Sequence, residues 1–214
     1  MNQASRSRPM RSGPDRARRA AIVLCGGESR RMGRDKAELP FAGQSMLAHM
    51  TKIVGTTVAA TVVVKSPSQM LPGDLPPVTI GVDRRAHGGP LEGLTAGWAC
   101  LAADVEAVFA CGCDLPLLRP AVVERLFSRL DDYDAVVPRI GRQAHPLAAV
   151  YARRVGTQVA ACLAAKRRSM HALVERLNVR WITSDELSEV DPQLESLLNV
   201  NRLEDYRRAL EARG

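Results

Sequence analysis

A glycine-rich segment near the N-terminus combines residue types that bind phosphate. It reads Leu24-Cys-Gly-Gly-Glu-Ser-Arg-Arg-Met-Gly-Arg-Asp-Lys36 and follows an apolar run directly. Gly26 and Gly27 have no Cβ, so backbone amides there can approach a ligand closely. Arg31 and Lys36 add positive charge. We expect a phosphate-binding loop here rather than a plain strand-to-helix turn with solvated arginines, although the glycine spacing fits neither a Walker loop nor a dinucleotide fingerprint.

A lone carboxylate, Asp114, follows a second apolar run over residues 107–111, in the sequence Cys113-Asp-Leu-Pro-Leu117. At the carboxyl end of a buried strand its side chain points toward the crevice where α/β proteins bind ligands. A buried carboxylate is costly unless a cation pairs with it, and Mg²⁺ prefers such oxygen ligands. The alternative is that Asp114 only caps the turn before Pro116.

A third segment, Gly89-Pro-Leu-Glu-Gly93, comes shortly after Asp83 and begins a helical pattern. Pro90 suits the first turn of a helix, where its missing N–H costs nothing. The free amides of that turn favour an anion or the polar edge of a base. A simple capped turn is the alternative reading.

These three segments require a fold that brings the ends of several strands together. Apolar runs predict buried strands, and segments with helical periodicity alternate with them. The fold class we expect is α/β, a single-domain, doubly wound, mostly parallel sheet with helices on both faces. The predicted strands are 20–25, 60–65, 78–82, 107–111, 135–138 and 147–151, and the predicted helices are 45–53, 91–102, 121–130, 153–164 and one after residue 201.

The chain has 214 residues and a net charge of +7, most of which lies at its N-terminus. Residues 1–19 hold six arginines against the single carboxylate Asp15 and contain few apolar side chains. Such a segment buries too little apolar surface to offset its ordering entropy. We therefore expect residues 1–19 to be a disordered basic tail and residues 20–214 to form one domain, of a length typical for a single core.

Several functional classes are disfavoured by the same composition. With the excess charge in the tail and only 4% aromatic residues, base stacking on nucleic acid is not expected. The sequence has no apolar stretch typical of a secretory signal or a membrane span, so we expect a cytoplasmic protein that does not contact a membrane. The five cysteines lack the paired spacing of zinc sites, which leaves Cys111 and Cys113 as the one conceivable metal pair.

The glycine-rich segment resembles the nucleotide-binding loop of the molybdenum cofactor guanylyltransferases, within the wider Rossmann-like nucleotidyltransferase clan. The shared pattern is Leu-Ala-Gly-Gly, any, Ser, any, Arg-Met-Gly, any, Asp-Lys, and this chain departs from it only at Cys25, where alanine is usual. The resemblance continues through Asp83, the Gly89 segment and Asp114 to an Asn-x-Asn stretch before the last helix.

The resemblance implies GTP as donor, Mg²⁺ bound at Asp114, and molybdopterin as acceptor. The reaction would form molybdopterin guanine dinucleotide and release pyrophosphate, with molybdoenzymes or their chaperones as further partners. The catalytic residues would be Arg31, Lys36 and Asp114. Nucleotide binding would involve Leu24, Cys25, Gly26, Gly27, Lys36, Asp83, Gly89, Pro90, Leu91 and Asp114.

The acceptor would be bound by His145, Asn199 and Asn201. Asn201 also suits the N-cap of the last helix, with Glu204 three residues on. The basic run Lys166 to Arg168 could hold the acceptor phosphate or be a solvated helix end. A methyl group at Gly26 is expected to narrow the slot beneath the base. The alternatives to guanylyl transfer are a cytidylyl- or sugar-1-phosphate nucleotidyltransferase and a non-catalytic nucleotide-binding module that delivers the cofactor.

Overall fold

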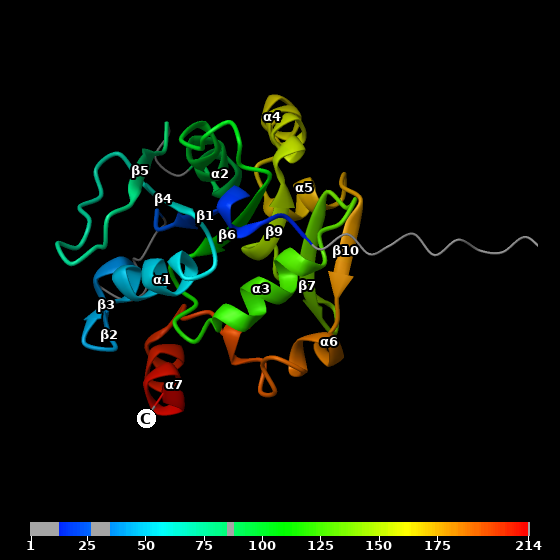
Figure 1. Ribbon diagram of the computed structural model, residues 1–214. Helices are drawn as coiled ribbons and strands as arrows, with labels where there is room; N and C mark the ends of the chain where they lie inside the picture. Colours follow the sequence, from blue (N-terminus) through cyan, green and yellow to red (C-terminus); the bar gives the residue numbers. More distant parts are fainter. Residues whose placement is uncertain (1–12, 27–34, 85–87, 214) are drawn as a thin grey trace, which may run out of the picture.

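The computed structural model describes residues 13–26, 35–84 and 88–213. The predicted site residues Gly27 and Arg31 lie outside these ranges. The described chain forms one main sheet with helices on both of its faces (Figure 1). None of the helices in these ranges is long and apolar enough to cross a bilayer.

The main sheet is mostly parallel, as expected, and its strand order is β10-β7-β9-β6-β1-β4-β5, with β8 paired to β7. Every neighbouring pair on this path is parallel except the two pairs that β9 makes with β6 and β7. The strands are β1 (Arg19–Leu24), β4 (Ala60–Lys65), β5 (Thr79–Val82), β6 (Ala107–Gly112), β7 (Ala135–Ile140), β8 (Gln143–Ala144), β9 (Ala148–Ala152) and β10 (Val179–Ile182).

The apolar runs form the centre of this sheet because both of their faces are covered. All six residues of β6 are buried, and Ala20 to Val23 of β1 are fully buried beside it. Leu24 lies in register with Val64 of β4 and with Gly112 of β6. Three parallel strands therefore end at the same level, and the loops that follow them meet at one edge.

Strand β9 runs against its neighbours, which the expected doubly wound topology did not include. Only residues 141–147 separate it from β7, whereas a parallel crossover needs about a dozen residues or more. The chain instead turns back through β8, which pairs with the end of β7. The sheet is consequently mixed at this point.

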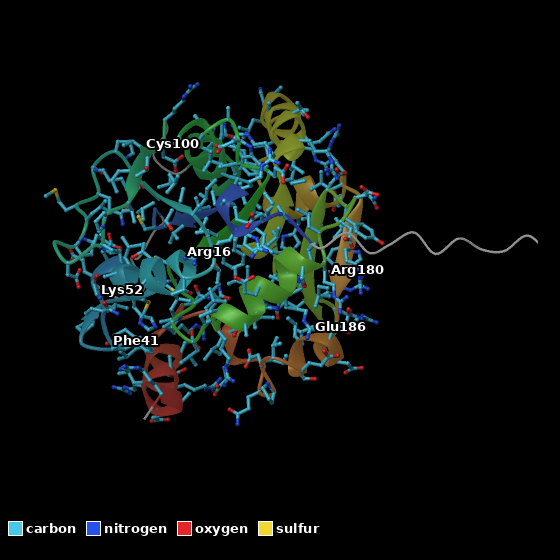
Figure 2. All side chains as sticks on the ribbon, viewed as in Figure 1. Arg16, Phe41, Lys52, Cys100, Arg180 and Glu186 are labelled. Atoms are coloured by element: carbon cyan, nitrogen blue, oxygen red, sulfur yellow. The ribbon has the colours of Figure 1, made fainter. Side chains whose placement is uncertain are left out.

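Two sets of helices cover the sheet (Figure 1). On one face α2 (Pro90–Ala99) packs against α4 (Gly156–Ala164), which contacts α5 (Met170–Val174). On the other face α1 (Met46–Gly55) packs against α3 (Pro120–Ser128). The short helix α6 (Ser184–Ser188) contacts β7, and its Glu186 pairs with Arg180 of the edge strand β10 at 2.6 Å (Figure 2).

The C-terminal helix α7 (Leu203–Arg213) belongs to a smaller apolar cluster. Phe41, in the hairpin of β2 (Pro40–Phe41) and β3 (Gln44–Ser45), lies beside α7 (Figure 2). Its ring packs in this cluster with Met46, Val200 and Ala209, and Arg213 lies over it. A hydrogen bond also holds the segment before α7 next to the end of β6, since Val200 N donates to Asp114 O at 2.8 Å.

The predicted tail, residues 1–19, includes residues that belong to the folded domain. Residues 1–12 lie outside the described ranges, but Arg16–Arg18 form a 3-10 helix, η1, and Arg19 begins β1. Arg18 pairs with Glu106 at 2.5 Å and Arg19 with Glu124 at 2.6 Å. These arginines are bound to the folded body, so the structured domain begins before residue 20.

Gly97 offers a test of how tightly α2 packs on the sheet. A Cβ at Gly97 would lie 2.7 Å from Cγ2 of Ile22, which is fully buried in β1. We expect Gly97→Ala to lower the free energy of unfolding by about 1–3 kcal/mol through overpacking. The roughly 1 kcal/mol of helix propensity that alanine gains over glycine offsets part of this loss, so the expected net loss is up to about 2 kcal/mol.

The matched control is Gly55→Ala at the end of α1, where an added Cβ meets nothing within 4 Å and which should be neutral or slightly stabilising. Urea unfolding of the three proteins measures both effects. A Gly97→Ala variant as stable as the wild type would show that α2 can move away from β1 without a loss in the free energy of unfolding.

Candidate active site

A cavity of about 470 Å³ opens where β1, β4 and β6 end. Its walls come from the residues that follow each strand, from the start of α2 and from Asn199. Of the residues predicted to bind nucleotide, the following line it: Leu24, Cys25, Gly26, Lys36, Asp83, Gly89, Pro90 and Asp114. Leu91 does not, because its side chain is fully buried in the core.

Lys36 and Asp114 meet in the wall of this cavity. The Nζ of Lys36 lies 3.4 Å from Oδ2 of Asp114 and donates to Oδ1 of Asn201 at 2.8 Å. The side chains of Lys36 and Asp114 are only 18% and 19% exposed, so the pair is partly desolvated. The Asp114 carboxylate is thus paired, and its partner is the predicted catalytic lysine.

Two local features fix this geometry. Asp35 accepts a hydrogen bond from Ala37 N at 3.0 Å and so caps the 3-10 turn η3 (Lys36–Glu38) on which Lys36 stands. On the other side, a Cβ at Gly112 would lie 2.4 Å from Oδ1 of Asp114. The carboxylate therefore occupies a position that only glycine at residue 112 leaves open.

Asp83 is a carboxylate in the wall of the cavity. It follows β5, and its Oδ1 is buried without a hydrogen-bond partner among the described residues. Burial raises the pKa of Asp83, and the nearby charge of Glu92 raises it further. A Cβ at Gly93 would come within 3.6 Å of Asp83, so the first turn of α2 packs closely against this carboxylate.

Gly89 and Gly26 are both needed as glycines, for different reasons. Gly89 has φ +86°, and a Cβ on it would lie 3.3 Å from Arg168 O. A Cβ on Gly26 would lie 2.7 Å from Oγ and 3.2 Å from N of Ser66. A methyl group at Gly26 would therefore press on Ser66, which follows β4 and lines the same cavity.

A second, larger cavity of about 1240 Å³ adjoins the first, and Pro90, Leu147 and Asn199 line both. His145 and Asn201 line it too, so all three residues predicted to bind the acceptor lie on it. Burial lowers the pKa of His145, which keeps its imidazole neutral at pH 7. The walls carry charges of both signs, from Arg202, Arg208, Glu195, Glu204 and Asp205.

Asn201 does not cap α7 in the predicted way. Oδ2 of Asp205 instead accepts hydrogen bonds from Asn201 N and Arg202 N, at 3.0 and 2.8 Å. This leaves the amide side chain of Asn201 for Lys36. Of the two interpretations of Asn201, the structure favours a place in the site.

The basic run after α4 lies outside both cavities. Arg167 pairs with Glu175 at 2.8 Å, and Arg168 contributes its backbone to the packing against Gly89. Lys166, Arg167 and Arg168 are all exposed. The solvated helix end is therefore the better of the two readings of this run.

The cysteines of the site are small hydrophobic residues. Burial raises the pKa of Cys25 to about 12 and raises that of Cys111 and Cys113 as well, so all three remain thiols. No cluster of three or more potential metal ligands occurs within the described part of the chain. The Cys111 and Cys113 pair gains no further ligand there.

Seven further residues line the smaller cavity that the sequence prediction assigned to neither the nucleotide nor the acceptor: Val64, Ser66, Gly88, Gly93, Gly112, Cys113 and Leu147. Ser66 directly follows β4, so the rule that directs attention to strand ends would have found it. Leu147 precedes β9 and reaches the same edge because β9 is antiparallel. Its position required the strand direction, which the sequence pattern alone did not provide.

Asp83→Asn should stabilise the protein without ligand at neutral pH. Its pKa is raised in the folded state, so the folded protein binds more protons than the unfolded chain and ∂ΔG/∂pH is negative across that window. The carboxylate therefore costs stability above its raised pKa, and a neutral amide costs less to bury.

Thermal unfolding of both proteins between pH 4 and pH 8 tests this expectation, with exposed Glu211→Gln as control. The midpoint of Asp83→Asn should exceed that of the wild type at pH 8, and the gap should close toward pH 4, near the ordinary pKa of about 3.9. A variant less stable than wild type at pH 8 would mean that the carboxylate has a stabilising partner.

Comparison with known proteins places these observations in a family. Residues 21–181 match the model of the MobA-like NTP transferase domain. A Mycobacterium tuberculosis (strain ATCC 25618 / H37Rv) relative called "Probable molybdenum cofactor guanylyltransferase" is 39% identical over 193 residues, 88% of this chain and 91% of the relative.

Solved structures agree on the fold. Molybdopterin-guanine dinucleotide biosynthesis protein A from Archaeoglobus fulgidus is similar with a TM-score of 0.73 at 23% identity, covering 90% of this chain and 97% of that one. A Mycobacterium tuberculosis H37Rv protein solved as a complex with manganese is similar with a TM-score of 0.63 at 16% identity, covering 92% and 100%. The strand-end cavity, the matched span and the close relative together establish that the chain belongs to the MobA-like NTP transferase domain family.

Proposed function

We propose that this protein transfers GMP from GTP to the terminal phosphate of molybdopterin, forming molybdopterin guanine dinucleotide and releasing pyrophosphate. The observation that carries the proposal is the cluster of Lys36, Asp114 and Asn201 at the junction of two adjoining cavities. One cavity suits a nucleotide and the other an acceptor. The relative from Mycobacterium tuberculosis carries the name of this activity.

The smaller cavity is the proposed site of the nucleotide. Its volume of about 470 Å³ lies within the usual range for small-molecule sites. The backbone at Leu24 to Gly26 and the first turn of α2 supply polar groups for the base. The Asp83 carboxylate, which lines this cavity, would supply an acceptor, and guanine, with N1–H and N2–H₂, offers it donors.

The proposed cation site is the Asp114 carboxylate. One carboxylate beside a phosphate site suits Mg²⁺, which usually keeps several waters and binds through one or two carboxylates plus substrate phosphates. The space that Gly112 leaves for Oδ1 shows that this carboxylate has a defined place. When bound, the cation would neutralise charge on the triphosphate.

The chain's own residues then act by position and charge. A terminal phosphate has a second pKa of about 6, so at neutral pH it is largely dianionic and can attack without a general base. Its oxygen forms a bond to the α-phosphorus of GTP while the bond to pyrophosphate breaks. Lys36 would stabilise the charge that gathers on the phosphate oxygens, in place of its contact with Asp114.

The larger cavity is the proposed site of the acceptor. Asn199 lines both cavities, and Asn201 lines the larger one while it contacts Lys36. These two amides are therefore suited to hold the acceptor phosphate beside the α-phosphorus. The neutral imidazole of His145 can accept or donate a hydrogen bond further along this cavity.

Nucleotide choice is the first test. The wild-type protein with molybdopterin and Mg²⁺ should release pyrophosphate with GTP and have a kcat/KM at least about tenfold lower with CTP or ATP, because a mismatched base leaves buried polar groups unpaired at about 1–3 kcal/mol each. Lys36→Ala should release none with any of the three.

Preference for CTP would overturn guanylyl transfer and leave nucleotidyl transfer standing. Nucleotide binding without pyrophosphate release would instead indicate a delivery module.

Gly112→Ala tests the place of the Asp114 carboxylate. The added Cβ, 2.4 Å from Oδ1, would displace the carboxylate, and a shift of about 1 Å can lower the rate up to about 100-fold. We expect kcat/KM for GTP to fall at least about tenfold. Gly73→Ala, where a Cβ meets nothing within 4 Å, is the control and should be unaffected. Equal activity of the two variants would argue against a catalytic role for the Asp114 position.

A further inference from the structure

We propose that Gln69 is a positioning residue for the transfer reaction. Its side chain ties both described ends of the glycine-rich segment, Cys25 and Asp35, to the end of β4, and thereby sets the place of Lys36. The inference rests on the proposed nucleotide site. Gln69 lies outside all the motifs that the sequence analysis identified.

The side-chain amide of Gln69 is fully used. Its Nε2 donates to Cys25 O at 3.0 Å and to Asp35 Oδ2 at 2.6 Å. Its Oε1 accepts from Ser66 N at 3.2 Å, and the Cys25 thiol lies 3.7 Å from it. One side chain thus joins the end of β1, the residue before Lys36 and the first residue after β4.

Gln69 is itself held firmly. Its N donates to Ser66 O at 3.1 Å and closes a turn with Pro67 at the second position, which favours such turns. Lys65 Nζ donates to Gln69 O at 2.7 Å. Ser68 and Met70 on either side are exposed, whereas Gln69 is half-buried, so of these three side chains only that of Gln69 turns inward.

The position of Lys36 depends on this clamp through Asp35. Oδ2 of Asp35 accepts from Gln69, while Oδ1 accepts from Ala37 N and caps the turn that carries Lys36. Without the glutamine, Asp35 Oδ2 loses this hydrogen bond, and the cap on Ala37 N remains. The Nζ of Lys36 would then be less well placed for a triphosphate, and geometric errors of this kind are costly in catalysis.

The contacts also explain why a carboxylate could not replace this amide. Both groups that face Nε2 are acceptors, and one is the charged Asp35. The charged side chain of Lys65 donates to the backbone of Gln69 and not to its amide group. Gln69→Glu keeps the shape, removes both donors and sets two carboxylates against each other, which raises the pKa of the introduced acid. Protonation of that acid at lower pH restores one donor.

The test measures binding of fluorescent mant-GTP with Mg²⁺ to the full chain, without any acceptor. Between pH 6 and pH 8 we compare wild type, Gln69→Glu, Gln69→Ala and Ser68→Glu, the last placing the same charge on the exposed neighbour. At pH 8, Gln69→Glu should weaken binding tenfold or more, and the loss should shrink as the pH falls. Gln69→Ala should weaken binding at every pH, and Ser68→Glu should match the wild type.

Thermal unfolding of each variant shows whether it is folded at the assay temperature. Folded Gln69→Glu and Gln69→Ala variants that bind mant-GTP as the wild type does would overturn the inference. So would a loss in Gln69→Glu that is the same at every pH. A wild-type protein that binds mant-CTP in preference to mant-GTP would contradict the proposed function instead, and the comparison of variants would then be made with mant-CTP.

Discussion

The ion pair between Lys36 and Asp114 is the contact around which this molecule is organised. It joins the turn after the glycine-rich segment to the end of β6, and Asn201 joins it to the segment before α7. Opposite charges this far from water stabilise each other only in a fixed geometry. The Asp35 cap, Gly112 and the Val200 to Asp114 hydrogen bond supply that geometry. In the proposed reaction, substrate phosphates and a cation would take over the same two charges.

Asp83 shows the opposite arrangement, a carboxylate whose buried Oδ1 has no hydrogen-bond partner among the described residues. Its burial is unfavourable in the absence of ligand, and nothing else in the described fold offsets it. Functional sites commonly carry such local costs, which the rest of the fold supports. Asp114 and Asp83 line the same cavity, and in the proposed reaction the first would bind a cation and the second would accept hydrogen bonds from the base.

The central part of the fold could be predicted because burial on both faces produces continuous apolar runs. The runs that became β1, β4 and β6 gave strand positions within a residue or two. The edge strand β10 was missed because only Ile182 is fully buried in it, and α5 and α6 are too short to show a helical period. The direction of β9 was missed because pattern alone does not encode direction, although the short connection from β7 contained that information.

The site residues, too, divide into those that a local sequence pattern could predict and those that depend on the tertiary arrangement. Residues that follow buried strands, such as Asp114, were found from their place alone, and the resemblance added Asp83 and Asn199. The contact of Lys36 with Asn201 spans 165 positions and depends on how α7 packs on Phe41, which no local pattern reports. Gln69 escaped notice because a half-buried glutamine in an exposed loop has no distinguishing neighbours in sequence.

Because β9 is antiparallel, the two cavities are lined by different kinds of segment. The smaller cavity is built on the ends of the central parallel strands, where an insertion would disturb the core. The larger one takes Gln143, Ala144 and His145 from the hairpin between β7 and β9. Hairpin loops accept changes in length readily, because no crossover helix depends on them. Within this architecture the acceptor could therefore diversify by loop replacement while the nucleotide chemistry stays constant.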